Sequence, residues 1–196
     1  MYTILDAIGA FIAGSALLIT LFTALLNIQG HAYNTTVQIQ TNTISERVTN
    51  VLEDYLSYVA TGSDINPSTA IIHAQRRSFS FNGKIQETLA SHNYVVKQGT
   101  PDGTTGWYPI EIIEDGTKIM GGNIWADQQF EFRYYDADGN LIPFLGLGQV
   151  HATDLPRIRS MSVEMSLVNR GWEYGTDMTP IHNQITFWKF FKNMYL

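Results

Sequence analysis

The chain has 196 residues, and its 18 acidic residues outnumber its 12 Lys and Arg residues, which gives a formal net charge of -6. Because the sequence contains no basic stripe, we expect no nucleic-acid partner. The chain has no cysteine, which excludes disulfides, thiol catalysis and cysteine-based metal sites. Its length and a hydrophobic content of 44% suit one folded domain with an N-terminal extension.

The most distinctive stretch is residues 7–26, an uncharged run of twenty residues that directly follows Asp6. As a helix it would be about 30 Å long, the thickness of the hydrocarbon core of a bilayer. A cleaved secretory signal is excluded, because such a signal has a basic start and no Lys or Arg occurs before Arg47. Two interpretations stay open. The run is either an ordinary transmembrane anchor or a helix that lies in the membrane first and later packs inside a protein assembly.

The helical pattern continues beyond this run, but its middle is weak. Gly30 lowers helix stability, and the Asn and Thr residues that follow it are poor helix formers. Apolar residues then recur at three- and four-residue spacing over residues 37–59, and Gly62 offers a C-terminal cap. We therefore expect a long helix that is apolar on all sides in its first half and on one face in its second half.

This pattern divides the chain into a helix over residues 1–60 and a β-rich globular head over residues 61–196. Within the helix, residues 1–27 form the apolar membrane or filament-core part, and residues 30–36 form a possible break. The predicted fold class is α+β, with the second half of the helix packed against an antiparallel sheet. Alternation of apolar and polar residues predicts the strands of this sheet near residues 77–82, 107–113, 129–135, 158–168 and 184–194.

Short motifs rich in Asn, Asp and Gly predict turns in the head. Asn82-Gly83 and Asp115-Gly116 are typical of two-residue hairpin turns. The segment from Asp136 to Asn140 has the oxygen-rich character of a calcium loop, but Leu145 stands where such a loop has its Glu. A hairpin turn is therefore the better interpretation of this segment.

Motifs for catalysis and cofactor binding are absent from the sequence. It contains no G-x-S-x-G, no P-loop and no dinucleotide fingerprint, and its five histidines never fall at metal-binding spacing. We therefore expect a protein that is not an enzyme and has no catalytic residue, metal or cofactor. Asn34 begins an N-x-[ST] sequon and is a possible glycosylation site, although a polar interruption of the helix explains the same residues.

The N-terminus, Tyr2-Thr3-Ile4-Leu5-Asp6 before an apolar run, resembles the mature N-terminus of type IV pilins and pseudopilins. Counted from Tyr2, Asp6 is the fifth residue, where that family has an acid, usually Glu. The C-terminal part resembles the J-type minor pseudopilins and related large minor pilins. The residues that carry this second resemblance are Phe132-Arg133-Tyr134-Tyr135-Asp136, Leu155-Pro156, Ile158-Arg159 and Phe191-Lys192-Asn193.

The resemblance implies a structural subunit that polymerises through its apolar helix into a type IV pilus-like or pseudopilus filament. It also implies that Asp6 sets the axial register by meeting the first residues of a neighbouring copy, Met1 and Tyr2. The helix would melt around Gly30 during assembly. The core of the filament would be packed by small and bulky residues of the run, namely Gly9, Phe11, Gly14, Leu18 and Phe22.

The implied partners are other copies of the chain, membrane lipid before assembly, and the assembly machinery of the inner membrane. The implied location is the inner, or cytoplasmic, membrane before assembly and then an extracellular filament at the cell surface. An alternative from another class stays open, a monomeric, single-pass membrane-anchored extracytoplasmic binding or sensor domain. Such a monomer would stay small in detergent, whereas a pilin would be shed from cells as long filaments.

Overall fold

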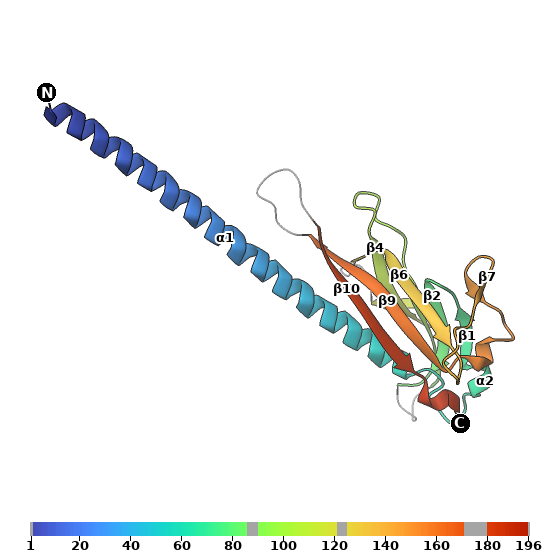
Figure 1. Ribbon diagram of the computed structural model, residues 1–196. Coiled ribbons are helices and arrows are strands. Elements are labelled where there is room, and N and C mark those ends of the chain that lie inside the picture. Colours follow the sequence, from blue (N-terminus) through green and yellow to red (C-terminus); the bar gives the residue numbers. More distant parts are fainter. Residues whose placement is uncertain (1, 86–89, 121–124, 171–179, 196) are drawn as a thin grey trace. The chain divides into compact units, whose positions relative to one another are not determined.

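The computed structural model describes residues 2–85, 90–120, 125–170 and 180–195 (Figure 1). It is an α+β structure in which the long helix α1 (Tyr2–Ser57) is followed by the short helix α2 (Pro67–Ala70) and by antiparallel strands. By its internal contacts the chain divides into two units. The smaller unit contains residues 1–40 and 171–179, and the larger, called the head below, contains residues 41–170 and 180–196.

Helix α1 is continuous through the polar middle that the sequence marks as weak. The hydroxyls of Thr35 and Thr36 each donate a 2.9 Å hydrogen bond to a backbone carbonyl of the preceding turn. These bonds satisfy the hydroxyls inside the helix, so the polar residues continue it instead of interrupting it. The break expected at residues 30–36 is absent from this single chain. For the assembled filament, the break stays a prediction.

The helix ends at Ser57, earlier than the cap that Gly62 suggests. Ala60 adopts a left-handed conformation with φ 57°, and its N–H donates to the carbonyl of Asn82 at 3.2 Å. Val59 also forms a bridge with Gly83. The chain therefore leaves the helix to pair with the sheet, and no local sequence signal predicts this tertiary contact.

The main sheet has eight strands, and its neighbouring strands are antiparallel. Its path runs β1–β2–β3–β4–β6–β9–β10, and β5 pairs with β4 off this path. Strands β7 and β8 form a separate pair. The strand bounds are β1 (Ile71–Ala74), β2 (Ser78–Gly83), β3 (His92–Gln98), β4 (Tyr108–Glu114), β5 (Thr117–Met120), β6 (Trp125–Tyr135), β7 (Phe144–Leu145), β8 (Gln149–Val150), β9 (Ser160–Arg170) and β10 (Pro180–Phe190).

The five predicted strand ranges overlap β2, β4, β6, β9 and β10. Two local features differ from the sequence expectation. Strand β1 lies outside the five predicted ranges, and the residues after β10 form a short 3-10 helix, η2 (Lys192–Tyr195), instead of extending the strand. A second 3-10 helix, η1 (Leu155–Arg157), precedes β9. The physical reason for β1 is its antiparallel pairing with β2, a partner that single-sequence alternation does not reveal.

The prediction of a hairpin turn at Asp115-Gly116 is confirmed, and the one at Asn82-Gly83 is wrong. Asp115 and Gly116 have φ values of 47° and 82°, as a type I′ turn between β4 and β5 requires. Asn82 and Gly83 instead lie inside β2, where they pair with Asn93 and His92 of β3.

Gly83 is explained by a close approach of α1 and not by a turn. A Cβ built at Gly83 would lie 2.0 Å from the backbone oxygen of Tyr58, a distance that no real Cβ adopts. Only glycine therefore allows the end of α1 to touch β2 at this point.

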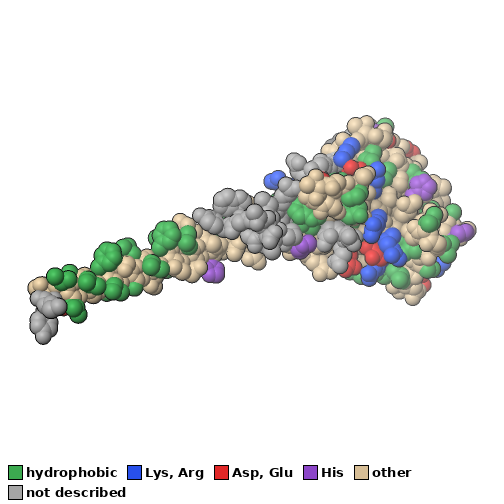
Figure 2. Space-filling view, turned by 90° about the horizontal axis from the view of Figure 1, so that it is seen from above, with side chains coloured by type: hydrophobic (Ala, Val, Ile, Leu, Met, Phe, Trp, Pro, Cys, Tyr) green, Lys and Arg blue, Asp and Glu red, His purple; other side chains and the backbone are tan. Residues whose placement is uncertain are grey.

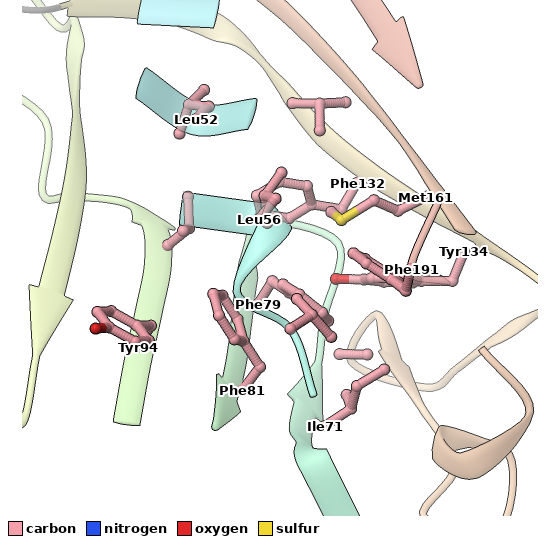
Figure 3. Close-up of a cluster of buried hydrophobic side chains, with 14 of the residues drawn as sticks. Leu52, Leu56, Ile71, Phe79, Phe81, Tyr94, Phe132, Tyr134, Met161 and Phe191 are labelled. Atoms are coloured by element: carbon pink, nitrogen blue, oxygen red, sulfur yellow. The ribbon is translucent and has the colours of Figure 1, made fainter. Parts of the chain in front are cut away.

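The core of the head forms where the last turns of α1 pack on the sheet (Figure 3). Val48, Leu52 and Leu56 recur every four residues on one face of α1 and are almost completely buried. Burying each such side chain contributes about 1.5–3 kcal/mol. Within the head, the expected packing of the amphipathic part of the helix on the sheet is thus confirmed. Many of the side chains that surround this face are aromatic, and they include Phe79, Phe81, Tyr94, Phe132, Tyr134 and Phe191.

Two polar contacts fasten the chain around the end of α1. The side-chain amide of Asn193 donates to the carbonyl of Val59 at 3.3 Å and to the hydroxyl oxygen of Thr61 at 3.1 Å. The largely buried Lys84 ammonium lies 2.6 Å from the carboxylate of Asp64. The C-terminal residues and the segment after β2 therefore both hold the residues that follow the end of α1.

We predict that Gly83→Ala lowers the free energy of unfolding of the full chain in detergent by about 3 kcal/mol, because the new methyl group overlaps the Tyr58 carbonyl. The matched control is Gly103→Ala, since no atom lies within 4 Å of a Cβ built there. Thermal unfolding followed by near-ultraviolet circular dichroism measures both. Equal melting temperatures for the two variants would contradict the close approach.

Candidate functional site

The candidate functional site is the apolar segment, residues 7–26 of α1. By length and composition, α1 contains a stretch that can cross a membrane. Its large apolar side chains are exposed in the single chain, with Phe11 at 77% and Leu18 at 68%, and Figure 2 shows them along the helix. Monomeric soluble proteins rarely expose a contiguous apolar surface of this size, so this segment requires lipid or another protein around it.

The polar side chains of the apolar segment are satisfied inside the helix. Ser15, Thr20 and Thr23 each donate a hydrogen bond to a backbone carbonyl of the preceding turn, at 2.8, 2.9 and 2.9 Å. The helix itself pairs the backbone groups. The segment therefore meets the condition for surroundings without water, where every unsatisfied polar group is costly.

The apolar segment has two unlike faces. At 100° per residue, small and weakly polar residues fall along one side of α1, at alternating spacings of three and four residues. We call this side the small-residue face, and it contains Asp6, Gly9, Ala13, Ala16, Thr20, Thr23 and Asn27. The opposite, bulky face contains Ile4, Ile8, Phe11, Leu18, Phe22 and Leu25. Alternating three- and four-residue spacing is the repeat of helices that pack side by side.

The five residues expected in a filament core lie on different sides of this helix. Gly9 belongs to the small-residue face, Phe11, Leu18 and Phe22 belong to the bulky face, and Gly14 lies at the edge of the bulky face. No atom comes within 4 Å of a Cβ built at Gly9 or Gly14. In the described part of the chain, therefore, nothing packs closely enough to require glycine at either position.

Asp6 lies at the N-terminal end of the small-residue face and is exposed. It makes no ion pair with any residue that the structure describes. Tyr2 is the first residue of α1, and Met1 lies outside the described residues. The expected register contact joins two copies of the chain, and it stays a prediction.

The two residues singled out in the polar middle of α1 are both helical. No atom lies within 4 Å of a Cβ built at Gly30, and Asn34 is exposed. An exposed amide is accessible to modification, so glycosylation of Asn34 stays a prediction.

The calcium-like motif forms a turn in which both carboxylate oxygens of Asp136 already have partners within the chain. One oxygen of Asp136 accepts the backbone N–H groups of Asp138 at 3.0 Å and Asn140 at 2.8 Å. The other lies 3.4 Å from a guanidinium nitrogen of Arg157. Gly139 adopts φ 79°, and Tyr135 forms a bridge with Leu141 across the turn. The prediction of a hairpin turn is confirmed.

Among the described residues, no three His, Asp or Glu side chains come together as metal ligands. The structure does reveal ionic clusters that sequence spacing misses, and one of them surrounds His92. The Nδ1 atom of His92 lies 2.6 Å from a carboxylate oxygen of Asp115 and 3.5 Å from one of Glu114. The same Glu114 oxygen accepts a 3.3 Å hydrogen bond from the hydroxyl of Tyr94. Strand β3 and the β4–β5 turn bring these groups together, so no local motif could have indicated them.

Neither a protein-family model nor a curated protein nor a solved structure matches this chain.

Asp136→Asn is predicted to lower stability at neutral pH and to flatten its dependence on pH. The backbone N–H of Asn140, followed by weaker contacts, holds the pKa of Asp136 below its ordinary value of 3.8. Because the folded pKa is the lower one, the stabilisation is present above the ordinary pKa and is lost as pH falls through the folded pKa. Urea unfolding at a series of pH values between about 5 and 2 measures the effect. An Asp136→Asn variant with the pH dependence of the wild type would disprove this account. Asp138→Asn is the control, because no hydrogen bond or ion pair to the Asp138 side chain is found in the described regions.

Proposed function

We propose that this chain is a structural subunit that polymerises through its apolar N-terminal helix into a helical, pilus-like surface filament. It performs no catalysis and holds no cofactor. The observation that carries the proposal is the apolar segment, which is of bilayer length, is exposed in the single chain and has its hydroxyls satisfied within the helix. The resemblance of residues 2–6 and of the C-terminal part to pilins and pseudopilins supports the same function.

The energetics of assembly follow from the two faces of the helix. In a membrane, lipid covers both faces, and in a filament other copies of α1 cover them. The free energy of moving apolar surface between these two surroundings is close to zero, so the hydrophobic effect alone does not favour polymerisation. The small-residue face favours the filament over lipid, because residues such as Gly9, Ala13 and Ala16 let a second helix approach closely and so add van der Waals contacts.

Asp6 makes the polymer specific. A carboxylate in a dry helical core is costly unless a cation or hydrogen-bond donors meet it. After Asp6 the next charged residue in the sequence is Glu46, so no side chain on this part of α1 can neutralise it. We propose that the N-terminal amine and first residues of a neighbouring copy, Met1 and Tyr2, pair with Asp6 and thereby fix the axial register.

The proposal implies an assembly machinery, a membrane and a final location at the cell surface. Before assembly the subunit lies in the inner membrane with lipid around residues 7–26. An assembly machinery in that membrane then transfers it into a filament at the cell surface, where its neighbours are further copies. No nucleic acid takes part, in keeping with the net charge of -6.

Asp6→Ala is predicted to leave the head folded and the subunit in the membrane but to abolish filaments or reduce them strongly. The reason is that the register contact is lost while the apolar segment is unchanged. Membrane fractionation measures insertion, circular dichroism measures folding of the head, and electron microscopy of sheared surface material measures filament formation. Asp6→Glu, which keeps the charge, is the control and should retain filaments. Normal filaments from Asp6→Ala cells would refute the register role.

A second prediction tests the small-residue face. Gly9→Leu adds bulk where we propose that two helices meet, so it should reduce filament yield by at least about tenfold without lowering membrane insertion. The matched control is Leu18→Ile on the bulky face, which conserves volume and should change the yield little. Equal yields from the two variants would show that no close helix contact forms at Gly9. A wild-type chain that forms no filaments at the cell surface and is recovered only as a monomer from detergent-solubilised membranes would favour the alternative, an anchored binding or sensor domain.

A further inference from the structure

The head has a cleft of about 350 Å³ between the end of β1 and the β7–β8 hairpin. It is lined by Gln75, Arg76, Arg77, Gly146, Leu147 and Gly148. Both arginines come from the β1–β2 connection, and the backbone N–H of Arg76 donates to the carbonyl of Gly148 at 2.8 Å. The cleft therefore has two arginines on one side and the tip of the β7–β8 hairpin on the other, and a backbone hydrogen bond joins the two sides.

The charges of the cleft are only partly used within the chain. The Arg76 guanidinium lies over the ring of Phe144 at 5.5 Å and 3.7 Å from a Glu131 oxygen, which orients it. Arg77 is exposed and has no ion-pair partner among the residues described. Leu147 is 104% exposed at the tip of the hairpin. The cleft thus presents one unpaired cation, one oriented cation and an apolar side chain.

The solvent-facing side of α1 within the head has the opposite charge. Glu46 and Asp54 are exposed, Glu53 is half-buried beside the buried face of Leu52, and all three carboxylates lack an ion-pair partner in the described regions. Glu46 and Glu53 are seven residues apart, which places them almost in line, about 10 Å apart along the helix. We call this side the acidic face, although Arg47 also lies on it.

We propose that the cleft of one copy binds the acidic face of α1 in the next copy, so that Arg76 and Arg77 meet Glu46, Glu53 and Asp54 between subunits. This inference rests on the proposed filament and names the contact between neighbouring heads. The occupant is a second copy because the chain itself carries the complementary charges on a different part of the head. The cleft adjoins β1 and β7, whereas the acidic face belongs to α1.

A contact of this kind has the symmetry that a filament needs. Two different surfaces of the same subunit form a heterologous interface, which propagates into a helix when the rotation does not close. Copies with a net charge of -6 repel one another, so an interface that places cations opposite carboxylates selects one docking orientation. Single exposed ion pairs are weak, but this contact has several and is repeated by every subunit.

Cysteine cross-linking tests the contact directly, because the full chain contains no cysteine. Cells would co-express Arg77→Cys and Glu53→Cys forms of the chain, and sheared surface material would be oxidised and run under non-reducing conditions. We expect a disulfide-linked dimer when both forms are present and none when either is expressed alone. Thr104→Cys, an exposed position away from the cleft, replaces Arg77→Cys as the control and should not cross-link.

Charge exchange provides a second readout that does not need cross-linking. Arg76→Glu with Arg77→Glu should reduce filament yield about tenfold, the loss expected when two charge pairs per contact become repulsive. Adding Glu46→Arg and Glu53→Arg to the same chain should restore the yield to within about twofold, because the charges are again opposite. If the wild type forms filaments but the cysteine variants give no cross-link and the charge exchange gives no rescue, this contact is contradicted and the proposed filament is not. A wild-type chain that forms no filament would overturn both proposals.

Discussion

The structure depends on one continuous helix whose apolar surface is buried in its second part and exposed in its first. In the head, the face of Val48, Leu52 and Leu56 is covered by the chain's own sheet. Residues 7–26 have no such cover in the single chain, yet their hydroxyls are satisfied within the helix. A segment with this chemistry is stable in lipid or among other helices and unstable in water. The function of the chain must therefore be sought in what surrounds that segment.

The head holds the helix with contacts that leave little freedom at its end. The carbonyl of Tyr58 reaches β2 at Gly83, and the amide of Asn193 bonds the residues that follow the helix. These contacts link the first element of the chain to an early strand and to the last residues.

Much of the fold could be predicted from the sequence, because periodicity is a local property. The long helix, the strand pattern around Phe130–Tyr135 and the turn at Asp115-Gly116 all follow from spacing and turn chemistry. The predictions that failed concern residues whose structure depends on tertiary contacts. Gly83 looked like a turn residue, but it is there because α1 touches β2, and β1 forms because β2 offers an edge. In the candidate site, the sequence identified Asp6 and the apolar run. The division into a small-residue and a bulky face follows from helical periodicity and could have been predicted as well, whereas the unpaired charges of the head became apparent only with the sheet in place.

The central claim is that this chain forms filaments through its apolar helix, and imaging of the wild type tests it most directly. Material sheared from the surface of expressing cells would be examined by electron microscopy, with mass spectrometry to identify the chain and its N-terminal residue. The account predicts long, thin filaments whose principal protein is this chain, with the apolar segment present. Sheared material without filaments, together with a monomer that is recovered only from detergent-solubilised membranes, would contradict it.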